Sequence, residues 1–424
     1  MSPHRKDMEA SPQARKKSDM SFFGLGIAPR ILEILERIKF TTPTPIQSKA
    51  IPPAIEGKDV IGIAQSGTGK TLAFAIPVVQ HLAQEKGAGL VLAPTRELAM
   101  QIDETFRLFS DAFKIKTACL IGGAPMHSQT QSLRKNPRIV IATPGRLIDH
   151  MNRRNFMPGN VTMLVLDEAD RMLDMGFKPQ VEEILKNITK DRQTMLFSAT
   201  MPVEIMQMIN KHMRLPVHVE IAPPGTTAEG IAQELYIVKR ETKIQLLGKV
   251  LSEQHGSVLL FIRTKHNARK IAKALCKMGH RATDIHSDKS LGQRRAALEG
   301  FKTGRYRILV ATDVAARGID VKQIEIVINY DLPDDIENYV HRIGRTGRAG
   351  KKGKAISFAT PDQSRDVKNI ENLIRMQLPV MKHPEIQAEN FDRRTKSERP
   401  GGRHYKTQLL PRGKKKRSYS LKWQ

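Results

Sequence analysis

Hydrophobic and polar positions along this chain predict short strands separated by helices. Residues 29–39 place apolar side chains at helical spacing, which predicts an amphipathic helix. Beyond it, apolar runs of strand length recur between longer mixed segments, at 60–64, 89–93, 138–142, 163–166, 194–198, 257–262, 282–286, 307–311, 325–329 and 354–358. This alternation is typical of βαβ units with a parallel sheet. We therefore expect an α/β fold.

The pattern breaks once, near the middle of the chain, where Pro and Gly predict an interdomain linker. At 424 residues the chain is long enough for two or three domains. We expect a disordered N-terminal extension at 1–19, a short segment at 20–48, a first domain at 49–221, the linker at 222–232, a second domain at 233–378 and a basic flexible tail at 379–424.

The charge balance points to a polyanionic partner. The formal net charge is +27, and residues 391–424 hold 12 Lys or Arg against Asp392 and Glu398. Such a surplus favours nucleic acid as the partner, although a basic surface can also serve solubility alone. We expect no membrane contact, because the apolar runs are too short for a span. Cys119 and Cys276 lack metal-ligand spacing, so we expect buried thiols in a cytoplasmic protein.

A glycine-rich turn follows the apolar run 60–64 and precedes an apolar, helix-compatible segment. This strand–turn–helix context is the one that a phosphate-binding P-loop requires. Glycines let backbone N–H groups converge on phosphate oxygens, Lys70 can reach the terminal phosphates, and Thr71 can bind Mg²⁺. A plain turn is the alternative. The predicted nucleotide site consists of Ala64, Gln65, Ser66, Gly67, Thr68, Gly69, Lys70 and Thr71, with Ala64 where the pattern usually opens with Gly.

Three carboxylates follow the apolar run 163–166. At a strand end beside a P-loop, Asp167 is placed to bind the nucleotide's Mg²⁺ and Glu168 to orient or deprotonate a water molecule. An acidic strand end by itself is more often the start of a helix. Together with the P-loop, it predicts hydrolysis of a nucleoside triphosphate.

The sequence Asp-Glu-Ala-Asp at 167–170 resembles the hallmark of the DEAD-box RNA helicases of superfamily 2. Further motifs stand in that family's order, at 43–47, 94–98, 122–123, 143–146, 198–200, 261–265, 311–320 and 339–348. The resemblance covers roughly residues 20 to 378, and the compact layout is similar to bacterial members with a short basic C-terminal tail. It implies two tandem RecA-like domains, each a parallel sheet flanked by helices, and RNA-stimulated ATP hydrolysis coupled to local unwinding of short RNA duplexes.

The resemblance also implies roles for single residues. Gln47 would bind the adenine edge, Phe22 would stack on the ring, and Asp320 would meet the ribose. Arg345 and Arg348 would reach the γ-phosphate from the second domain. Coupling between ATP and RNA would involve Asp170, Ser198, Thr200 and His341. The RNA backbone would contact Pro94, Thr95, Arg96, Gly123, Thr143, Gly145 and Arg146 in the first domain and Arg263, Thr312 and Asp313 in the second.

Several assignments have plainer alternatives. Phe22 can be a core aromatic, 143–146 can be only a turn, and the two arginines can be surface pairs. Two positions depart from the family pattern. Lys39 stands where Gly is usual, and Leu291 stands where Gln is common, which puts one interdomain polar contact in doubt.

Two other functions stay open at this point. One is an ATP-gated RNA clamp or assembly factor with little unwinding, and the other is a DNA translocase. Sequence-tolerant backbone contacts with RNA are the expected mode of binding, by a monomer. Ribosome assembly, RNA decay and cold adaptation are all compatible with the motifs.

Overall fold

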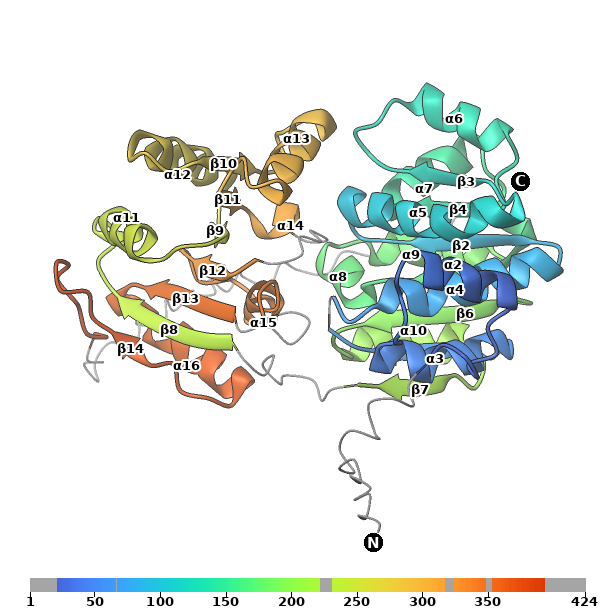
Figure 1. Ribbon diagram of the computed structural model, residues 1–424, viewed down its shortest axis with the longest axis horizontal. Coiled ribbons are helices and arrows are strands. Elements are labelled where there is room, and N and C mark those ends of the chain that lie inside the picture. Colours follow the sequence, from blue (N-terminus) through green and yellow to red (C-terminus); the bar gives the residue numbers. More distant parts are fainter. Residues whose placement is uncertain (1–20, 66, 222–230, 317–323, 348–352, 393–424) are drawn as a thin grey trace, which may run out of the picture. The chain divides into compact units, whose positions relative to one another are not determined.

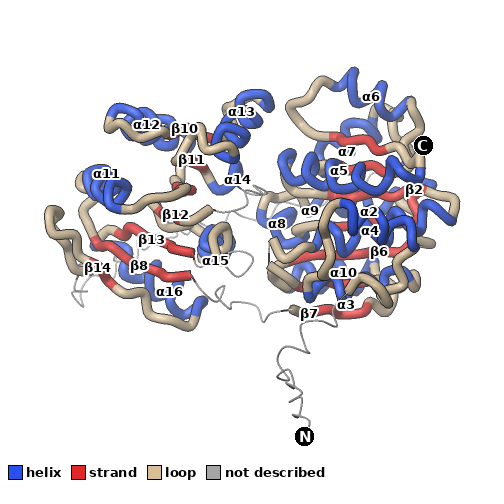
Figure 2. The backbone as a smooth tube through the Cα atoms, in the orientation of Figure 1, coloured by secondary structure: helices blue, strands red, loops and turns tan. Residues whose placement is uncertain are grey.

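In this computed structural model, the described residues are 21–65, 67–221, 231–316, 324–347 and 353–392. They form two seven-stranded sheets, each with helices packed on both faces (Figures 1 and 2). The fold of two tandem RecA-like domains is therefore confirmed. The predicted extension at 1–19 lies outside the described residues, as does most of the predicted tail.

The first sheet has the strand order β3-β4-β2-β5-β6-β1-β7, and all its pairs are parallel. Most of its strands are short apolar runs that are buried along their whole length, as expected when helices cover both faces. The strands are β1 (Val60–Ile63), β2 (Ala88–Leu92), β3 (Thr117–Leu120), β4 (Ile139–Ala142), β5 (Val161–Leu166), β6 (Gln193–Ser198) and β7 (Val217–Glu220).

Two layers of helices cover this sheet. One face packs against α2 (Pro29–Arg37), α3 (Pro45–Ile55), α4 (Lys70–Gln84) and α5 (Arg96–Ser110), with the short helix η1 (Asp111–Phe113) after α5. The other face packs against α6 (Met126–Arg134), α7 (Pro144–Asn152), α8 (Ala169–Asp174), α9 (Lys178–Asn187) and α10 (Val203–His212), with η2 (Pro158–Asn160) before β5. The helix predicted at 29–39 is α2, which ends at Arg37.

The second sheet has the order β10-β11-β9-β12-β13-β8-β14 and is also parallel throughout. Its strands are β8 (Ile231–Ile237), β9 (Val258–Phe261), β10 (Ala282–Ile285), β11 (Ile308–Ala311), β12 (Ile326–Asn329), β13 (Gly353–Ala359) and β14 (Val380–Met381). One face packs against α11 (Lys243–Glu253) and α12 (Lys265–Lys277). The opposite face carries α13 (Leu291–Lys302), α14 (Asp313–Ala316), α15 (Glu337–Ile343) and α16 (Ser364–Ile374), with η4 (Pro361–Gln363) before α16.

Several expectations need correction. The predicted linker at 222–232 ends earlier, because β8 begins at Ile231. The second domain does not end at 378, since β14 pairs with β8 and the Glu389 amide donates to the Ile237 carbonyl at 2.9 Å. The flexible tail expected from 379 therefore cannot begin before the end of this packed segment. Cys119 is half-buried as a thiol near the core, but Cys276 is exposed rather than buried.

Within the described part of the chain, no helix is both long and apolar enough to span a bilayer.

Candidate functional site

The P-loop turn connects β1 to α4 in the first domain. Gly67 and Gly69 have φ values of 85° and 96°, the left-handed region that glycine adopts without strain. Helix α4 begins at Lys70, whose buried ammonium donates to the Ala64 carbonyl at 2.9 Å. Lys70 is thus held over the turn, close to the N-terminus of a helix, where anions bind favourably. The neighbouring predicted residues Gln65, Thr68 and Thr71 lie in the same turn or at the start of α4.

Gln47 ties this turn to helix α3. Its amide Nε2 donates to the Gly69 carbonyl at 3.0 Å, and its Oε1 accepts from the Thr44 amide at 2.8 Å in a capping box. A Cβ on Gly69 would lie 2.5 Å from the Gln47 Nε2, so a side chain there would displace the Gln47 amide. The segment 43–47 is therefore in direct contact with the P-loop.

Phe22 and Lys39, both near the N-terminus, bear on two of the sequence predictions. Phe22 is 3 % exposed and belongs to the core of the first domain, which agrees with the alternative that it is a core aromatic. Lys39 has φ 61°, a left-handed conformation that favours glycine. Lys39 therefore carries a local strain of about 1–2 kcal/mol that glycine would not have at this position.

The acidic strand end lies beside the P-loop. Burial raises the pKa of Asp167 to about 7, against the opposing effect of the Lys70 charge. Glu168 is buried with φ 50°, and its Oε2 accepts a hydrogen bond from the Arg171 Nη1 at 2.8 Å. Arg171 is itself almost fully buried, so this ion pair is shielded from solvent. The pair fixes the orientation of the Glu168 carboxylate.

Asp170 joins the ends of β5 and β6. Its Oδ2 accepts three hydrogen bonds, from the Ala199 amide, the Thr200 amide and the Thr200 hydroxyl, at 3.0, 2.9 and 3.1 Å. In return, the Asp170 amide donates to the Ser198 Oγ at 3.2 Å. Burial alone would raise the pKa of Asp170, but the nearby positive charges outweigh burial and lower it. The carboxylate is therefore ionised and holds 198–200 against 167–170.

The residues predicted to contact RNA in the first domain gather at the ends of β2, β3 and β4, which are neighbours in the sheet. Thr95 caps α5 by accepting from the Leu98 amide, and Thr143 precedes α7, which begins at Pro144. Arg96 packs on the turn at Gly123, where a Cβ would lie 2.2 Å from the Arg96 Nη1. Burial, and then the charges of Arg294 and Arg146, lower the pKa of Arg96.

The remaining members of this set complete the same edge. The Arg146 Nη1 donates to the Ala124 carbonyl at 2.9 Å, a Cβ on Gly145 would face open space, and Pro94 precedes Thr95. One edge of the first sheet thus holds the predicted nucleotide and catalytic residues after β1 and β5, the predicted coupling residues after β6, and the predicted RNA residues after β2, β3 and β4.

In the second domain, the predicted residues again follow strand ends. Asp313 accepts from the Nε and Nη2 of Arg342, each at 2.6 Å. The Arg263 Nε lies 3.1 Å from the Asp334 Oδ1, and Thr312 is buried after β11. The predicted RNA contact Asp313 is therefore engaged by Arg342 within its own domain.

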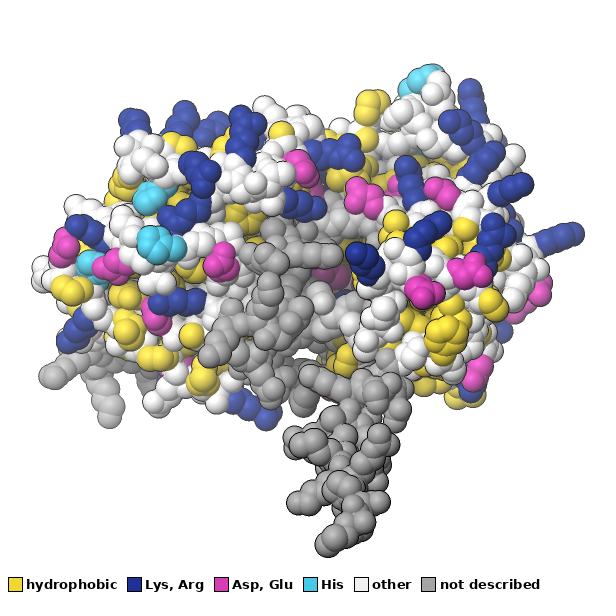
Figure 3. All heavy atoms as spheres, in the orientation of Figure 1, with side chains coloured by type: hydrophobic (Ala, Val, Ile, Leu, Met, Phe, Trp, Pro, Cys, Tyr) yellow, Lys and Arg dark blue, Asp and Glu magenta, His cyan; other side chains and the backbone are white. Residues whose placement is uncertain are grey.

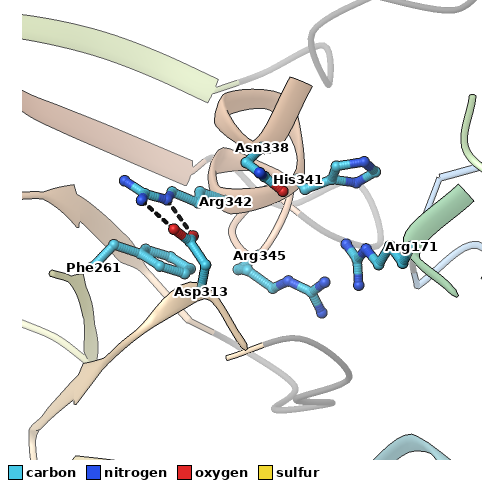
Figure 4. Close-up of a pocket in the computed structure, with 7 residues that line it drawn as sticks. All are labelled: Arg171, Phe261, Asp313, Asn338, His341, Arg342 and Arg345. Atoms are coloured by element: carbon cyan, nitrogen blue, oxygen red, sulfur yellow. Dashed lines mark hydrogen bonds and ion pairs between the residues drawn. The ribbon is translucent and has the colours of Figure 1, made fainter. Parts of the chain in front are cut away.

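A small pocket brings together residues of α8 and of the second domain (Figure 4). Burial and the Arg171 charge lower the pKa of His341 to about 3, so the ring is neutral at physiological pH. Arg345 is buried in the same pocket. The residues lining the pocket are Arg171, Phe261, Asp313, Asn338, His341, Arg342 and Arg345.

Three predicted residues, Ser66, Asp320 and Arg348, lie outside the described residues. Two buried arginines of the site were not predicted. Arg171 directly follows the Asp-Glu-Ala-Asp run and Arg342 lies within the motif 339–348, so their place in those motifs was the available signal.

A further unpredicted pair joins α5 to α13. The Arg294 Nε lies 2.7 Å from the Glu97 Oε1, and both side chains are buried. Leu291, at the start of the same helix, packs against the core cluster of the first domain. Leu291, which stands where Gln is common in the family, therefore makes an apolar contact.

The surface carries more basic than acidic side chains on the face drawn in Figure 3. This agrees with a polyanionic partner.

Comparisons with known proteins match both domains. The model of the DEAD/DEAH box helicase family matches residues 44–209, and that of the helicase conserved C-terminal domain matches residues 242–350. The ATP-dependent rRNA helicase RRP3 of Debaryomyces hansenii is 44 % identical over 377 residues, covering 88 % of this chain and 79 % of the relative. The protein of that name from Candida albicans is also 44 % identical, over 86 % of this chain and 69 % of the relative.

Among solved structures, Saccharomyces cerevisiae Dbp5 bound to RNA and ADP BeF3 has a TM-score of 0.77 and 32 % identity, covering 85 % of this chain and 95 % of that one. The chain belongs to the DEAD-box family of ATP-dependent RNA helicases. The expected likeness to bacterial members is not supported, because the curated relatives described above are yeast proteins.

Proposed function

We propose that this protein uses RNA-stimulated ATP hydrolysis to separate short duplexes locally in ribosomal RNA. One observation carries the proposal: a single sheet edge holds the P-loop and acidic residues beside the predicted RNA residues, with Asp170 hydrogen-bonded between β5 and β6. The relatives named as rRNA helicases support ribosomal RNA as the substrate.

In this proposal, residues 64–71 hold the phosphates and Gln47 contacts the adenine edge. Because Gln47 already binds the Gly69 carbonyl, adenine contact and P-loop geometry are linked. We do not assign the base contact to Phe22, whose ring lies in the core. Asp320 would meet the ribose.

The oxygen donors beside the P-loop fit Mg²⁺. This ion prefers one or two carboxylates together with phosphate oxygens. The buried Asp167 carboxylate is close enough to feel the charge of Lys70, and Thr71 follows Lys70 in the first turn of α4. Burial raises the pKa of Asp167, and a bound cation would keep the carboxylate ionised. Mg²⁺ held by Asp167 and Thr71 would neutralise negative charge on the phosphates.

Glu168 would orient or deprotonate the attacking water, with its carboxylate fixed by Arg171. Arg345 and Arg348 would stabilise charge on the γ-phosphate. The pocket in Figure 4 supports the assignment of Arg345, because Arg171, Arg342 and Arg345 line it together with one carboxylate, that of Asp313. An arginine-lined pocket suits an anion such as a phosphoryl group.

RNA would be held through its backbone by Arg96, Gly123 and Arg146 in the first domain and by Arg263 in the second. Hydrogen bonds of Asp170 with Thr200, and the neighbouring His341, would pass the nucleotide state to this surface. Ribosomal or RNA-decay complexes are the partners we propose. The monomeric state and the cytoplasmic location stay predictions.

Comparing RNA with DNA tests this function directly. ATP turnover by the full chain would be measured with single-stranded RNA and with DNA of the same sequence. We expect RNA to stimulate turnover and DNA to compete poorly. Equal stimulation by DNA would instead favour a DNA translocase.

A further inference from the structure

Lys243 is a buried ammonium in the second domain that the ATP and RNA assignments leave unused. It is the first residue of α11 and is 3 % exposed. Its Nζ donates to the Tyr330 carbonyl at 2.8 Å and to the Phe358 carbonyl at 3.2 Å, and lies 3.7 Å from the Asp331 Oδ1. A buried charge is tolerated only when it is paired and hydrogen-bonded, so these contacts hold the surrounding strand ends together.

The position of Lys243 corresponds to that of Lys70. The two sheets have the same strand order, so β8 takes the place of β1, β12 that of β5 and β13 that of β6. In each domain, the helix after the corresponding strand begins with the lysine, α4 with Lys70 and α11 with Lys243. The loop at 238–242 contains no glycine, unlike the P-loop. This loop therefore lacks the glycines that let backbone N–H groups converge on a phosphate. The ammonium of Lys243 is bound instead by the carbonyls of Tyr330 and Phe358.

Asp331 connects Lys243 to the residues proposed for RNA binding. The Asp331 Oδ2 accepts from the Arg263 amide at 3.1 Å. Its carbonyl accepts from the Arg342 Nη1 at 2.6 Å, and Arg342 in turn pairs with Asp313. The segment that begins at Tyr330 thus joins the buried ammonium to Arg263 on one side and to Arg342 on the other.

We propose that Lys243 is a positioning residue that sets the second domain's RNA contacts through Asp331. This inference rests on the proposed role of Arg263 in RNA binding. Without the ammonium, two carbonyls and a carboxylate lose their shared donor, and the segment at 330–334 relaxes. Arg263 and the Arg342–Asp313 pair then shift relative to the RNA backbone, while the P-loop in the other domain is untouched.

The test compares Lys243→Met, which keeps an apolar stem without the charge, with Lys249→Met as a matched control. Lys249 lies on the same helix but is exposed and pairs with Glu385 at the surface. The RNA concentration for half-maximal ATPase stimulation, the KM for ATP and the melting temperature would be measured on the full chain. We expect Lys243→Met to raise the half-maximal RNA concentration on the order of tenfold, because small misplacements of binding groups are costly. The KM for ATP and the Lys249→Met variant should stay close to wild type.

Two further variants keep the outcome decisive. Asp331→Asn retains the side-chain shape and the backbone carbonyl, and should weaken RNA binding even if Lys243→Met does not fold. Arg263→Ala tests the underlying role. If Arg263→Ala leaves RNA binding unchanged, the proposed RNA role of Arg263 is wrong. If Arg263→Ala weakens RNA binding while Lys243→Met and Asp331→Asn lower only the melting temperature, the positioning role of Lys243 is overturned.

Discussion

At the scale of single residues, the chemistry of this site depends on how buried charges are paired. Glu168 is held in a left-handed backbone conformation and its carboxylate accepts from Arg171 at 2.8 Å. The ion pair lies in a buried place, where a hydrogen bond is stronger than it would be in water. The orientation of the Glu168 carboxylate is therefore set before a substrate arrives.

Replacing this carboxylate by an amide tests its role. Glu168→Gln keeps the side-chain shape but loses most of the acceptor strength needed to orient or deprotonate water. We expect RNA-stimulated turnover to fall by about 10²–10⁴, the usual contribution of a general base, while ATP and RNA binding persist. Single-turnover ATP hydrolysis and equilibrium binding measure the two effects separately.

The matched control is Glu36→Gln, since Glu36 is an exposed carboxylate on α2. It should hydrolyse ATP like the parent. Turnover at the parental rate by Glu168→Gln would show that this residue does not activate water.

Sequence motifs predicted most of these residues, but not their contacts. The P-loop and the Asp-Glu-Ala-Asp run are each contiguous in sequence, so their spacing alone placed Lys70 at the start of a helix and Asp167 and Glu168 at a strand end. Arg171 was missed because its partner depends on the turn at Glu168, which no spacing reveals. The burial of Phe22 likewise depends on the assembly of the first domain's core, which includes residues distant in sequence.

At the scale of elements, the P-loop turn depends on one close approach. Gly69 has a positive φ, which glycine adopts without strain. In addition, a Cβ at this position would collide with the Gln47 amide. The turn therefore depends on a glycine for two separate reasons.

Gly69→Ala should raise the KM for ATP at least about tenfold, because the new Cβ displaces Gln47 and the backbone contact it makes with the turn. ATP titrations of the hydrolysis rate measure this. The matched control is Gly57→Ala, a position with φ 79° and nothing within 4 Å of the added Cβ.

Both variants carry a backbone strain of about 1–2 kcal/mol, so both should melt earlier than the parent. Only Gly69→Ala should bind ATP poorly. A similar KM for ATP in the two variants would mean that the contact with Gln47 does not shape the nucleotide site.

The hydrophobic pattern predicted every interior strand of the two sheets except β8, and also the edge strand β10. Continuous apolar runs mark β1, β2, β4, β5 and β6, which helices cover on both faces. The strands missed are β3, β7, β8 and β14, of which β3, β7 and β14 lie at sheet edges and β8 alternates buried and exposed positions. Edge strands bury less surface, so their sequences carry a weaker signal.

At the scale of the whole molecule, the two domains use one topology in two ways. The first places Lys70, which we propose binds phosphate, and the residues proposed to bind RNA at one sheet edge. The second fills the corresponding lysine position with internal hydrogen bonds. In our proposal, equivalent strand ends therefore serve ATP chemistry in one domain and RNA positioning in the other.

The basic C-terminal residues should contribute to RNA affinity without sequence preference. Residues 393–424 lie outside the described residues and contain 12 Lys or Arg against Glu398. If half of these basic groups neutralise phosphates, removing the segment should flatten the log–log salt dependence of RNA affinity by roughly 4, at about 0.7 for each phosphate on a single strand. RNA titrations over a series of salt concentrations measure the slope.

The truncation should fall after Asp392, because β14 and the residues up to Glu389 pair with the second sheet. A truncation after Leu378, which removes β14 as well, serves as the contrast and should lower the melting temperature. An unchanged affinity and slope after the first truncation would mean that the basic segment is only solvated.

Strand release from a short RNA duplex, followed together with ATP hydrolysis, tests the central claim most directly. We expect the wild-type protein to release one strand only when ATP is present, with turnover stimulated by RNA. The Glu168→Gln variant should bind both ligands without sustained turnover. ATP hydrolysis without strand release would instead describe an RNA clamp, and strand release that does not depend on ATP would contradict the account.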